Sequence, residues 1–257
     1  MEKVIVTGAT GFIGLHCIHQ LLQKGYSVNA TLRSESRKDE VKRALTDNNV
    51  SIENLELYVA DLENDGGWDE AVSGCKYMLH VASPLALGKQ PEEYFVKPAV
   101  AGAKRALEFA AKHGVEKVVL TSSFAAIVDT PDEKEVFNED DWSDPDKVGI
   151  TFYNKSKTLA EKFAWDFVKN NPNAPRLTVI NPVLVTGPTL SKDIGVSNSM
   201  VDRLASGKLP MVTKVHIGFV DVRDVAFAHI AALTNVESDN ERILVSEKVL
   251  WMDEVSK

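Results

Sequence analysis

The fold of this 257-residue chain is decided by the stretch TGATGFIG, residues Thr7 to Gly14. It follows a short apolar run and opens a segment in which Leu15, Ile18 and Leu22 recur at helical spacing. Its three glycines allow the unusual backbone angles of a tight turn and the close packing of a helix on a strand. The stretch therefore predicts a strand, a tight turn and a helix, which together form the first unit of a parallel sheet.

The same glycine turn predicts a binding site for a dinucleotide. At the start of the following helix, unpaired N–H groups and a partial positive charge attract phosphate. Glycine also lets a pyrophosphate approach the backbone closely. A glycine-rich turn without a ligand is the alternative, which the flanking strand and helix disfavour. The residues expected at this site are Thr7, Gly8, Gly11, Phe12, Ile13 and Gly14.

Further apolar runs alternate with segments of helical periodicity, and this alternation is typical of βαβ units. Val, Ile and Leu dominate the runs, as expected for strands that are covered on both faces. The predicted strands are Val4 to Thr7, Ser27 to Leu32, Leu55 to Val59, Tyr77 to Val81, Lys117 to Thr121 and Leu177 to Ile180. The predicted fold class is therefore α/β, with a doubly wound parallel sheet (Rossmann fold).

The pattern becomes irregular after Ile180. Short segments are interrupted by Pro182, Pro188, Gly195, Gly207 and Pro210. We predict a dinucleotide-binding domain over residues 1–180, to which 219–247 return, and a small C-terminal substrate-binding lobe over residues 181–218 and 248–257. The last residues resemble the opening of a helix, so we expect the lobe to be truncated at the C-terminus.

Composition and charge indicate the partners. With 44% hydrophobic residues, 26% charged residues and no apolar run of about 18 residues, the chain is typical of a globular protein that does not span a membrane. A net charge of −8 disfavours nucleic acid as a partner. We expect a small-molecule substrate and a monomer or homodimer. The first residues lack the basic and apolar segments of a signal peptide, so we expect a cytoplasmic location.

The two cysteines, Cys17 and Cys75, are predicted to be buried free thiols because no spacing pairs them with each other or with a metal. The six histidines are scattered and form no H-E-x-x-H pattern. No metal site is predicted.

The residues after the second strand predict a preference for NADPH. An NAD-specific site places an acid at this point, where it binds the ribose hydroxyls. Here the chain reads Ala30-Thr31-Leu32-Arg33-Ser34 instead. A guanidinium is planar and always charged, so it suits a 2′-phosphate. Arg33 is the first candidate and Arg37 the second, with solvated surface charges as the alternative; NADH remains a possible cofactor.

Tyr153 and Lys157 are the candidate catalytic pair, because a four-residue spacing places them one turn apart on the same helix face. Reduction of a carbonyl needs a proton for oxygen as well as hydride for carbon. The neighbouring cation is expected to lower the pKa of the phenol. A third residue from Thr121-Ser122-Ser123, at a strand end, is expected to hydrogen-bond the substrate oxygen.

These motifs resemble the short-chain dehydrogenases/reductases, whose glycine turn has the form G-x-x-G-x-x-G. The resemblance covers essentially the whole chain and is closest to the extended branch with dihydroflavonol reductases, cinnamoyl-CoA reductases and methylglyoxal or isovaleraldehyde reductases. Further segments that resemble this branch are His80-Val81-Ala82-Ser83-Pro84, Glu139-Asp140-Asp141-Trp142, Asn181-Pro182 and the segment from Val220 to Ala226.

The resemblance implies roles for individual residues. It makes Ser123 the catalytic serine, with Ser122 facing the sheet, and gives Lys157 a second role at the nicotinamide ribose. The further cofactor contacts that it implies are Asp61, Leu62, Val81, Ala82, Ser83, Pro182 and Val185, with Tyr153 and Lys157. The residues expected in a mainly apolar substrate pocket are Leu85, Phe124 and Thr186. The implied function is NADPH-dependent reduction of a small or medium apolar aldehyde or ketone, with Tyr153 as proton donor.

Two alternatives remain open. Sugar-nucleotide epimerases or dehydratases share the catalytic residues and hold NAD, but they usually carry Tyr-Gly after the serines, where this chain has Phe124-Ala125. Plant flavonoid reductases commonly have an asparagine at the position of Val128, which weighs against flavonoids. A non-catalytic NADP-sensing protein is the second alternative, but such proteins typically lose the Tyr-x-x-x-Lys pair.

Overall fold

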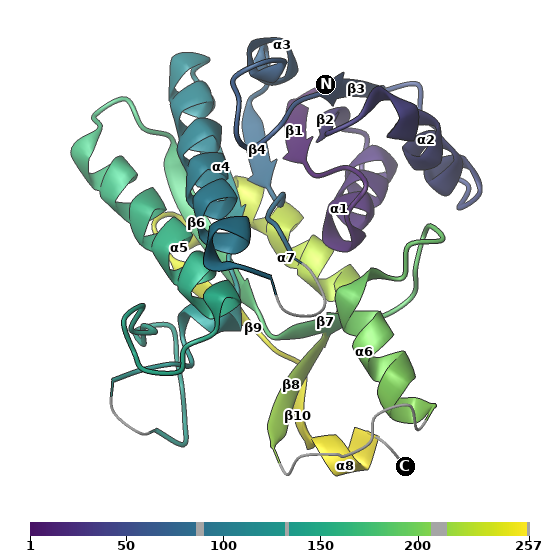
Figure 1. Cartoon of the computed structure of the whole chain (residues 1–257). Helices are drawn as coiled ribbons and strands as arrows, with labels where there is room; N and C mark the ends of the chain where they lie inside the picture. Colours follow the sequence, from purple (N-terminus) through teal and green to yellow (C-terminus); the bar gives the residue numbers. More distant parts are fainter. Residues whose placement is uncertain (86–89, 132–133, 207–214, 256–257) are drawn as a thin grey trace.

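The computed structural model describes residues 1–85, 90–131, 134–206 and 215–255 (Figure 1). Its centre is a seven-stranded sheet in the order β3-β2-β1-β4-β5-β6-β9, in which every described pairing is parallel. The strands are β1 (Lys3–Thr7), β2 (Ser27–Leu32), β3 (Leu55–Val59), β4 (Tyr77–His80), β5 (Lys117–Thr121), β6 (Arg176–Pro182) and β9 (Arg242–Val245). The predicted α/β fold with a doubly wound parallel sheet is confirmed.

Helices cover both faces of this sheet (Figure 1). In β1, Val4 and Val6 pack into one hydrophobic core, and Ile5 packs into the other. This alternation follows from the two-residue period of a strand. The first core includes α1 (Phe12–Gln23), α2 (Lys38–Thr46) and α7 (Val222–Thr234), and the second includes α3 (Trp68–Val72), α4 (Glu92–Lys112) and α5 (Phe152–Asn170).

The strand order reverses direction beside β1, because β2 lies on one side of it and β4 on the other. In open α/β sheets, ligands bind at such a switch point, outside the carboxyl ends of the strands. The glycine turn follows β1 at this edge, and the Thr121-Ser122-Ser123 segment lies where β5 ends. The topology therefore places both predicted motifs at the same edge of the sheet.

A second, three-stranded sheet has the order β10-β8-β7. It consists of β7 (Leu184–Thr186), β8 (His216–Asp221) and β10 (Lys248–Trp251), and α6 (Gly195–Ala205) and α8 (Met252–Val255) belong to the same part of the chain. Sequence periodicity did not predict these short strands. Gly207 and Pro210 lie outside the described residues. The boundaries of the two predicted domains remain a prediction.

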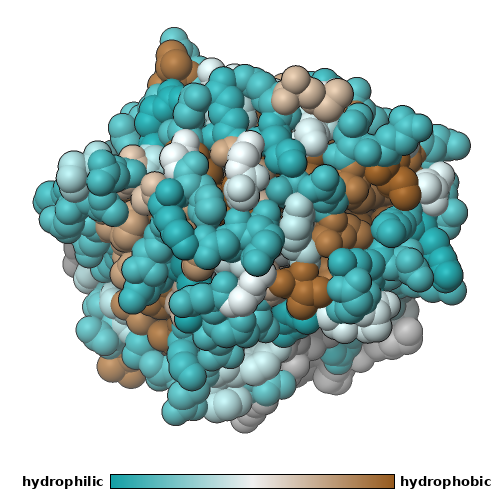
Figure 2. Space-filling model, turned by 90° about the horizontal axis from the view of Figure 1, so that it is seen from above, coloured by the Kyte–Doolittle hydropathy of each residue, from teal (hydrophilic) through white to brown (hydrophobic). Residues whose placement is uncertain are grey.

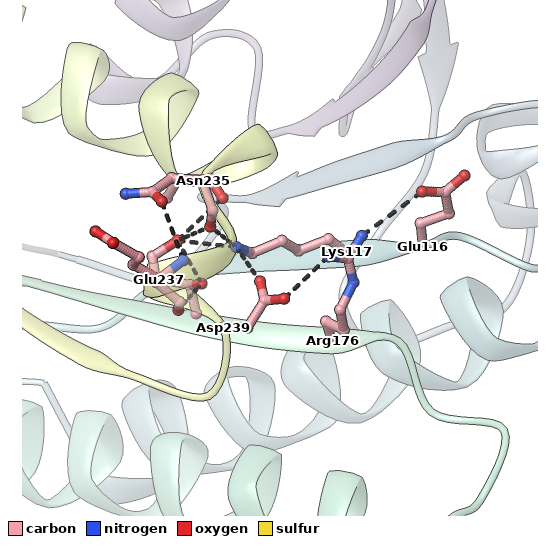
Figure 3. Close-up of polar contacts among 9 residues, drawn as sticks. Glu116, Lys117, Arg176, Asn235, Glu237 and Asp239 are labelled. Carbon is pink, nitrogen blue, oxygen red and sulfur yellow. Dashed lines mark hydrogen bonds and ion pairs between the residues drawn. The ribbon is translucent and has the colours of Figure 1, made fainter.

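A buried ionic cluster lies at the amino end of β5 (Figure 3). Lys117 is fully buried, and its Nζ donates to the carbonyl oxygen of Asn235 at 2.9 Å and to Ser238 Oγ at 2.8 Å. It also pairs with Asp239 Oδ1 at 2.5 Å, and Arg176 Nη1 binds Asp239 Oδ2 at 2.9 Å. Burial acts to raise the pKa of Asp239, but the bonds from Lys117 and Arg176 outweigh it and lower that pKa. We call Lys117, Arg176, Asn235, Ser238 and Asp239 the amino-end cluster.

The face seen in Figure 2 is largely hydrophilic, with hydrophobic side chains in separate small groups. No helix in the described part of the chain is both long and apolar enough to cross a membrane. Cys17 and Cys75 are buried free cysteines, as predicted. Within the described ranges, no group of three or more His, Cys, Asp or Glu side chains could hold a metal ion.

Candidate active site

The glycine turn between β1 and α1 leaves no room for side chains at two positions. Gly8 has a φ of +80°, and a Cβ there would lie 3.1 Å from the Cα of Ala82. At Gly14, a Cβ would lie 2.3 Å from the carbonyl oxygen of Gly8. Real Cβ contacts are longer, so any side chain at Gly14 would displace the turn. The turn is therefore built for close backbone approach, which a pyrophosphate requires.

Thr7 ties this turn to the end of β4. Its Oγ1 accepts hydrogen bonds from the backbone N–H groups of Val81 and Ala82, both at 3.0 Å. It also lies 3.0 Å from Nδ1 of His80. Burial lowers the pKa of His80 to about 3, so the ring is neutral. Because Thr7 Oγ1 already accepts two N–H bonds, its hydroxyl is left to donate a hydrogen bond to Nδ1. The predicted cofactor residues Thr7, Val81 and Ala82 are thus brought together.

The first turn of α1 offers backbone donors to an anion. The first helical hydrogen bond runs from the N–H of Leu15 to the carbonyl of Gly11 at 2.9 Å. The N–H groups of Phe12, Ile13 and Gly14 come before this bond, and the first turn holds no acidic residue. With the positive end of the helix dipole, they form a suitable cradle for the phosphates of a dinucleotide.

The two candidate arginines for a 2′-phosphate differ in their surroundings. Arg37 donates from Nε and Nη2 to the two carboxylate oxygens of Glu40, each at 2.8 Å, which occupies its guanidinium. Arg33 follows β2 directly and is exposed, and it forms no ion pair within the described residues. The structure therefore favours Arg33 over Arg37 as a phosphate ligand.

Asp61 and Leu62 lie after β3 and are partly buried. Asp61 Oδ1 accepts a hydrogen bond from the N–H of Glu63 at 2.8 Å, so this acid caps a turn. Leu62 packs closely on α4, where a Cβ at Gly102 would lie 2.8 Å from Leu62 Cδ2. Both contacts are structural, and the adenine-side role of these two residues remains a prediction.

The predicted catalytic residues Ser123, Tyr153 and Lys157 meet at the carboxyl end of β5. Thr151 caps α5 by accepting a hydrogen bond from the N–H of Asn154 at 3.0 Å, which fixes where the helix begins. The side chain of Ser123 lies near the phenol of Tyr153 and acts to lower the pKa of that phenol. Lys157 Nζ lies 6.0 Å from the centre of the Tyr153 ring and donates to the carbonyl of Thr121 at 3.2 Å.

The predicted lowering of the Tyr153 pKa is wrong for this structure. Burial raises the pKa of Tyr153 above its ordinary value, and the effect of Ser123 offsets only part of this rise. Burial also lowers the pKa of Lys157 to about 8, while the negative charge of Glu161 acts in the opposite direction. Desolvation disfavours the charged form of both groups, and here it is larger than the contacts that oppose it.

The predicted substrate-pocket residues come from three separate segments. Phe124 follows Ser123 and packs edge-on against Phe137, with ring centres 5.7 Å apart. Leu85 is 46% exposed, and Thr186, at the end of β7, is partly buried. The structure links none of these three to another by a hydrogen bond or a ring contact within the described residues. Their place in one pocket remains a prediction.

Pro182 and Ser83 flank the same region, at the end of β6 and just after β4. Val185 is 7% exposed and belongs to a small hydrophobic cluster against which Phe12 and Ile13 pack. This cluster joins the second sheet to the first turn of α1. The predicted cofactor residues Val185, Phe12 and Ile13 therefore pack in one continuous hydrophobic region.

Sequence reasoning missed several residues around the site. Phe95 on α4 is buried and packs edge-on against the Tyr153 ring, with ring centres 6.4 Å apart. Glu161 is completely buried on α5 and binds Ser122, Asn181 and Arg242. One signal was available, because Tyr153, Lys157 and Glu161 follow one another at four-residue steps. No comparable spacing indicates Phe95 or Arg242.

The arrangement defines a class of protein: a Rossmann-type sheet with a dinucleotide turn beside a Ser, Tyr and Lys constellation. The pattern of the NAD dependent epimerase/dehydratase family matches residues 4–245, and the chain belongs to this family. The family predicted from the sequence is therefore confirmed.

Several relatives of this chain are named as reductases. Cinnamoyl-CoA reductase 1 of Petunia hybrida is 37% identical over 258 residues, which cover 99% of this chain and 75% of the relative. The bifunctional dihydroflavonol 4-reductase/flavanone 4-reductase of Malus domestica is 35% identical over 259 residues, covering 95% and 72%. The crystal structure of yeast methylglyoxal/isovaleraldehyde reductase complexed with NADPH matches with a TM-score of 0.86 and 32% identity, covering 98% of this chain and 80% of that one.

Proposed function

We propose that this protein is an NADPH-dependent carbonyl reductase that acts on small or medium apolar aldehydes or ketones. The observation that carries the proposal is the meeting of Ser123, the Tyr153 phenol and the Lys157 ammonium at the sheet edge that also holds the glycine turn. A hydroxyl pair and a buried cation suit a reaction in which negative charge develops on a carbonyl oxygen.

The protonation states of the three side chains agree with this chemistry. NADPH, when bound, supplies hydride to the carbonyl carbon. Because the pKa of Tyr153 is raised, the phenol keeps its proton at neutral pH, as a proton donor must. Lys157, with a pKa of about 8, is mostly charged at pH 7 and stabilises the oxygen that loses its proton. Ser123 hydrogen-bonds the same substrate oxygen and orients it toward Tyr153.

The cofactor fits this chain's own residues. The glycine turn and the free N–H groups of α1 suit the pyrophosphate. Arg33, exposed and without an ion-pair partner among the described residues, suits the 2′-phosphate that distinguishes NADPH from NADH. The yeast reductase with the same fold is complexed with NADPH, which supports the same cofactor here.

The relatives support the substrate class. Cinnamoyl-CoA reductase and methylglyoxal/isovaleraldehyde reductase are named for a thioester and for aldehydes. We infer a carbonyl substrate for this chain because Ser123, Tyr153 and Lys157 suit an oxygen that becomes negatively charged. A cytoplasmic location and a monomeric or homodimeric state remain predictions from the sequence.

The test follows NADPH absorbance over a panel of aldehydes, ketones and flavonoids, with Tyr153→Phe as the inactive control. We expect turnover of several apolar aldehydes or ketones by the wild type alone. The family also includes epimerases, so the same preparation is incubated with a UDP-sugar. Interconversion of that sugar, without reduction of any carbonyl in the panel, would replace the reductase proposal with the epimerase one.

A further inference from the structure

Glu161 is a fully buried acid directly behind the catalytic pair. It lies on α5 four residues after Lys157, so the helix places it one turn further along the same face. The reaction proposed above gives it no role. A buried carboxylate is costly unless donors surround it, so its contacts indicate what it is for.

Four donors converge on this carboxylate. Oε2 accepts from Ser122 Oγ at 2.5 Å and from Asn181 Nδ2 at 2.8 Å. Oε1 accepts from Arg242 Nε at 2.5 Å and, more weakly, from Trp165 Nε1 at 3.4 Å. Since every partner donates, Glu161 acts only as an acceptor, as an ionised carboxylate does.

The contacts of Oε2 reach the catalytic serine from both sides. Ser122, its neighbour in the chain, is bonded to Glu161 through its own hydroxyl. Asn181 Nδ2 donates to Glu161 and also to the carbonyl oxygen of Ser123 at 3.2 Å. The backbone before and after Ser123 Cα is therefore fixed to one carboxylate, and this carboxylate sits on the helix that carries Tyr153.

Through Oε1, Glu161 contacts Arg242, which extends the same network to the segment that precedes α5. The side chain of Arg242, which is 9% exposed, stacks on the ring of Trp142 with its guanidinium carbon 3.7 Å from the ring centre. Its Nη1 donates to the carbonyl oxygens of Glu139 and Asp141 at 2.5 and 2.6 Å. Arg242 balances the charge of Glu161 and connects it to the acidic segment that precedes α5.

We propose that Glu161 is a positioning residue: its carboxylate holds the Ser122-Ser123 end of β5 and Asn181 of β6 against α5, and so fixes Ser123 relative to Tyr153 and Lys157. This inference rests on the proposed function for its catalytic readout. It assigns Ser122 a structural role, with its hydroxyl turned away from the reacting atoms and toward Glu161.

The first test is Glu161→Gln, which keeps the size of the side chain but replaces one acceptor oxygen with an NH₂ donor. That donor must face either Arg242 or the Ser122 and Asn181 pair, and one set of bonds is lost. We expect kcat to fall about 10- to 100-fold, because small displacements of catalytic groups have effects of this size. The dissociation constant of NADPH should change less than about 3-fold, because no cofactor-binding residue is displaced.

The matched control is Asp239→Asn in the amino-end cluster, which also alters one carboxylate of an ion pair at the same sheet. Its thermal stability should fall, but kcat should stay within about 2-fold of the wild type because the site lies at the other end of β5. The positioning role would be wrong if Asp239→Asn reduced kcat as much as Glu161→Gln does. It would also be wrong if the wild type, warmed until its stability equals that of Glu161→Gln, lost as much kcat. Either result would mean that the effect is general destabilisation.

A double variant tests the route through the serine. If Glu161 acts by placing Ser123, then Glu161→Gln should cost less than about 3-fold in a Ser123→Ala background, since the group that it positions is already gone. A full 10- to 100-fold loss in that background would show that Glu161 acts by another route and would overturn the proposal.

Hydrogen–deuterium exchange separates this proposal from the proposed function. The N–H groups of Ala125 and Ala126 donate to Ser123 Oγ at 3.1 Å and to its carbonyl at 2.9 Å. We expect both to exchange roughly 10-fold faster in Glu161→Gln and at the wild-type rate in Asp239→Asn. If the wild type reduces no carbonyl but the two variants show this exchange pattern, only the proposed function is contradicted. Unchanged exchange in Glu161→Gln contradicts the positioning role alone.

Discussion

Two buried lysines at opposite ends of β5 have very different surroundings. Lys117, at the amino end, is fully buried and has three acceptors within 2.9 Å, one of them the carboxylate of Asp239 (Figure 3). Lys157, at the carboxyl end, is 6% exposed and donates to one carbonyl, at 3.2 Å, among the described residues. An ammonium has three donors, so Lys117 is saturated and Lys157 is not.

The difference separates a structural lysine from a reactive one. Burial without sufficient partners lowers the pKa of Lys157 to about 8 and leaves its ammonium free to bind a ligand. At the amino end, the amino-end cluster binds together β5, β6 and the segment after α7, and no donor of Lys117 remains for chemistry. Variants at the two ends should therefore lose different properties.

The largest effect is expected for Tyr153→Phe at the carboxyl end. The phenylalanine ring keeps the packing against Phe95 but cannot donate a proton, so kcat should fall about 10²- to 10⁴-fold. The melting temperature should stay close to that of the wild type. Steady-state kinetics and a thermal melt on the same samples check both expectations, and near-normal turnover would remove Tyr153 from the mechanism.

Lys117→Met at the amino end should show the reverse pattern. Among the described residues, it leaves Asp239 with Arg176 as its remaining cationic partner, and loss of one partner from a buried pair costs about 3 to 5 kcal/mol of unfolding free energy. Urea unfolding measures the loss, while kcat per folded molecule should be unchanged. A proportional loss of kcat would mean that the two ends of β5 are not independent.

Lys157→Met should stabilise the protein at neutral pH, and this gain should depend on pH. The pKa of Lys157 is about 8 when folded, against an ordinary value of 10.5, so the unfolded chain binds the extra proton between these values and the wild type gains stability as pH rises. Below about pH 8, Lys157 is charged in the folded protein, and this buried charge lowers the unfolding free energy of the wild type by about 3 kcal/mol. Unfolding at pH 7 and pH 10 should show an advantage for Lys157→Met that shrinks at the higher pH, and an advantage that grows with pH would contradict the assignment.

Arg33→Ala should have the smallest effect and should change affinity alone. Loss of one charge-assisted phosphate contact costs about 1.5 to 3 kcal/mol, or roughly 10- to 150-fold in the dissociation constant of NADPH. NADH lacks this phosphate and should bind almost as before. Titration of both cofactors gives the answer, with Arg37→Ala as the control because Glu40 already occupies that guanidinium. Equal weakening of both cofactors would show that Arg33 does not bind the phosphate.

The central sheet could be predicted from local patterns because strand and helix periodicity are properties of neighbouring residues. β1 to β5 occur within one residue of their predicted bounds, whereas the edge strand β9 was not predicted. All three strands of the second sheet were missed. The short strands β7 and β10 show no clear period over three or four residues, and they exist by pairing with β8. The candidate site was predictable where its residues are close in the chain, as with Tyr153 and Lys157.

The sequence by itself determined six strands of the central sheet, the glycine turn and the identity of the reactive pair, because short-range sterics and periodicity set all three. Only the tertiary structure decided how that pair is charged and what holds it. Glu161 lies 39 residues from Ser122, 20 from Asn181 and 81 from Arg242, so no local pattern announces their meeting. The pKa of Tyr153 rises instead of falling because burial is a property of the folded chain, and here it outweighs the opposing effect of Ser123.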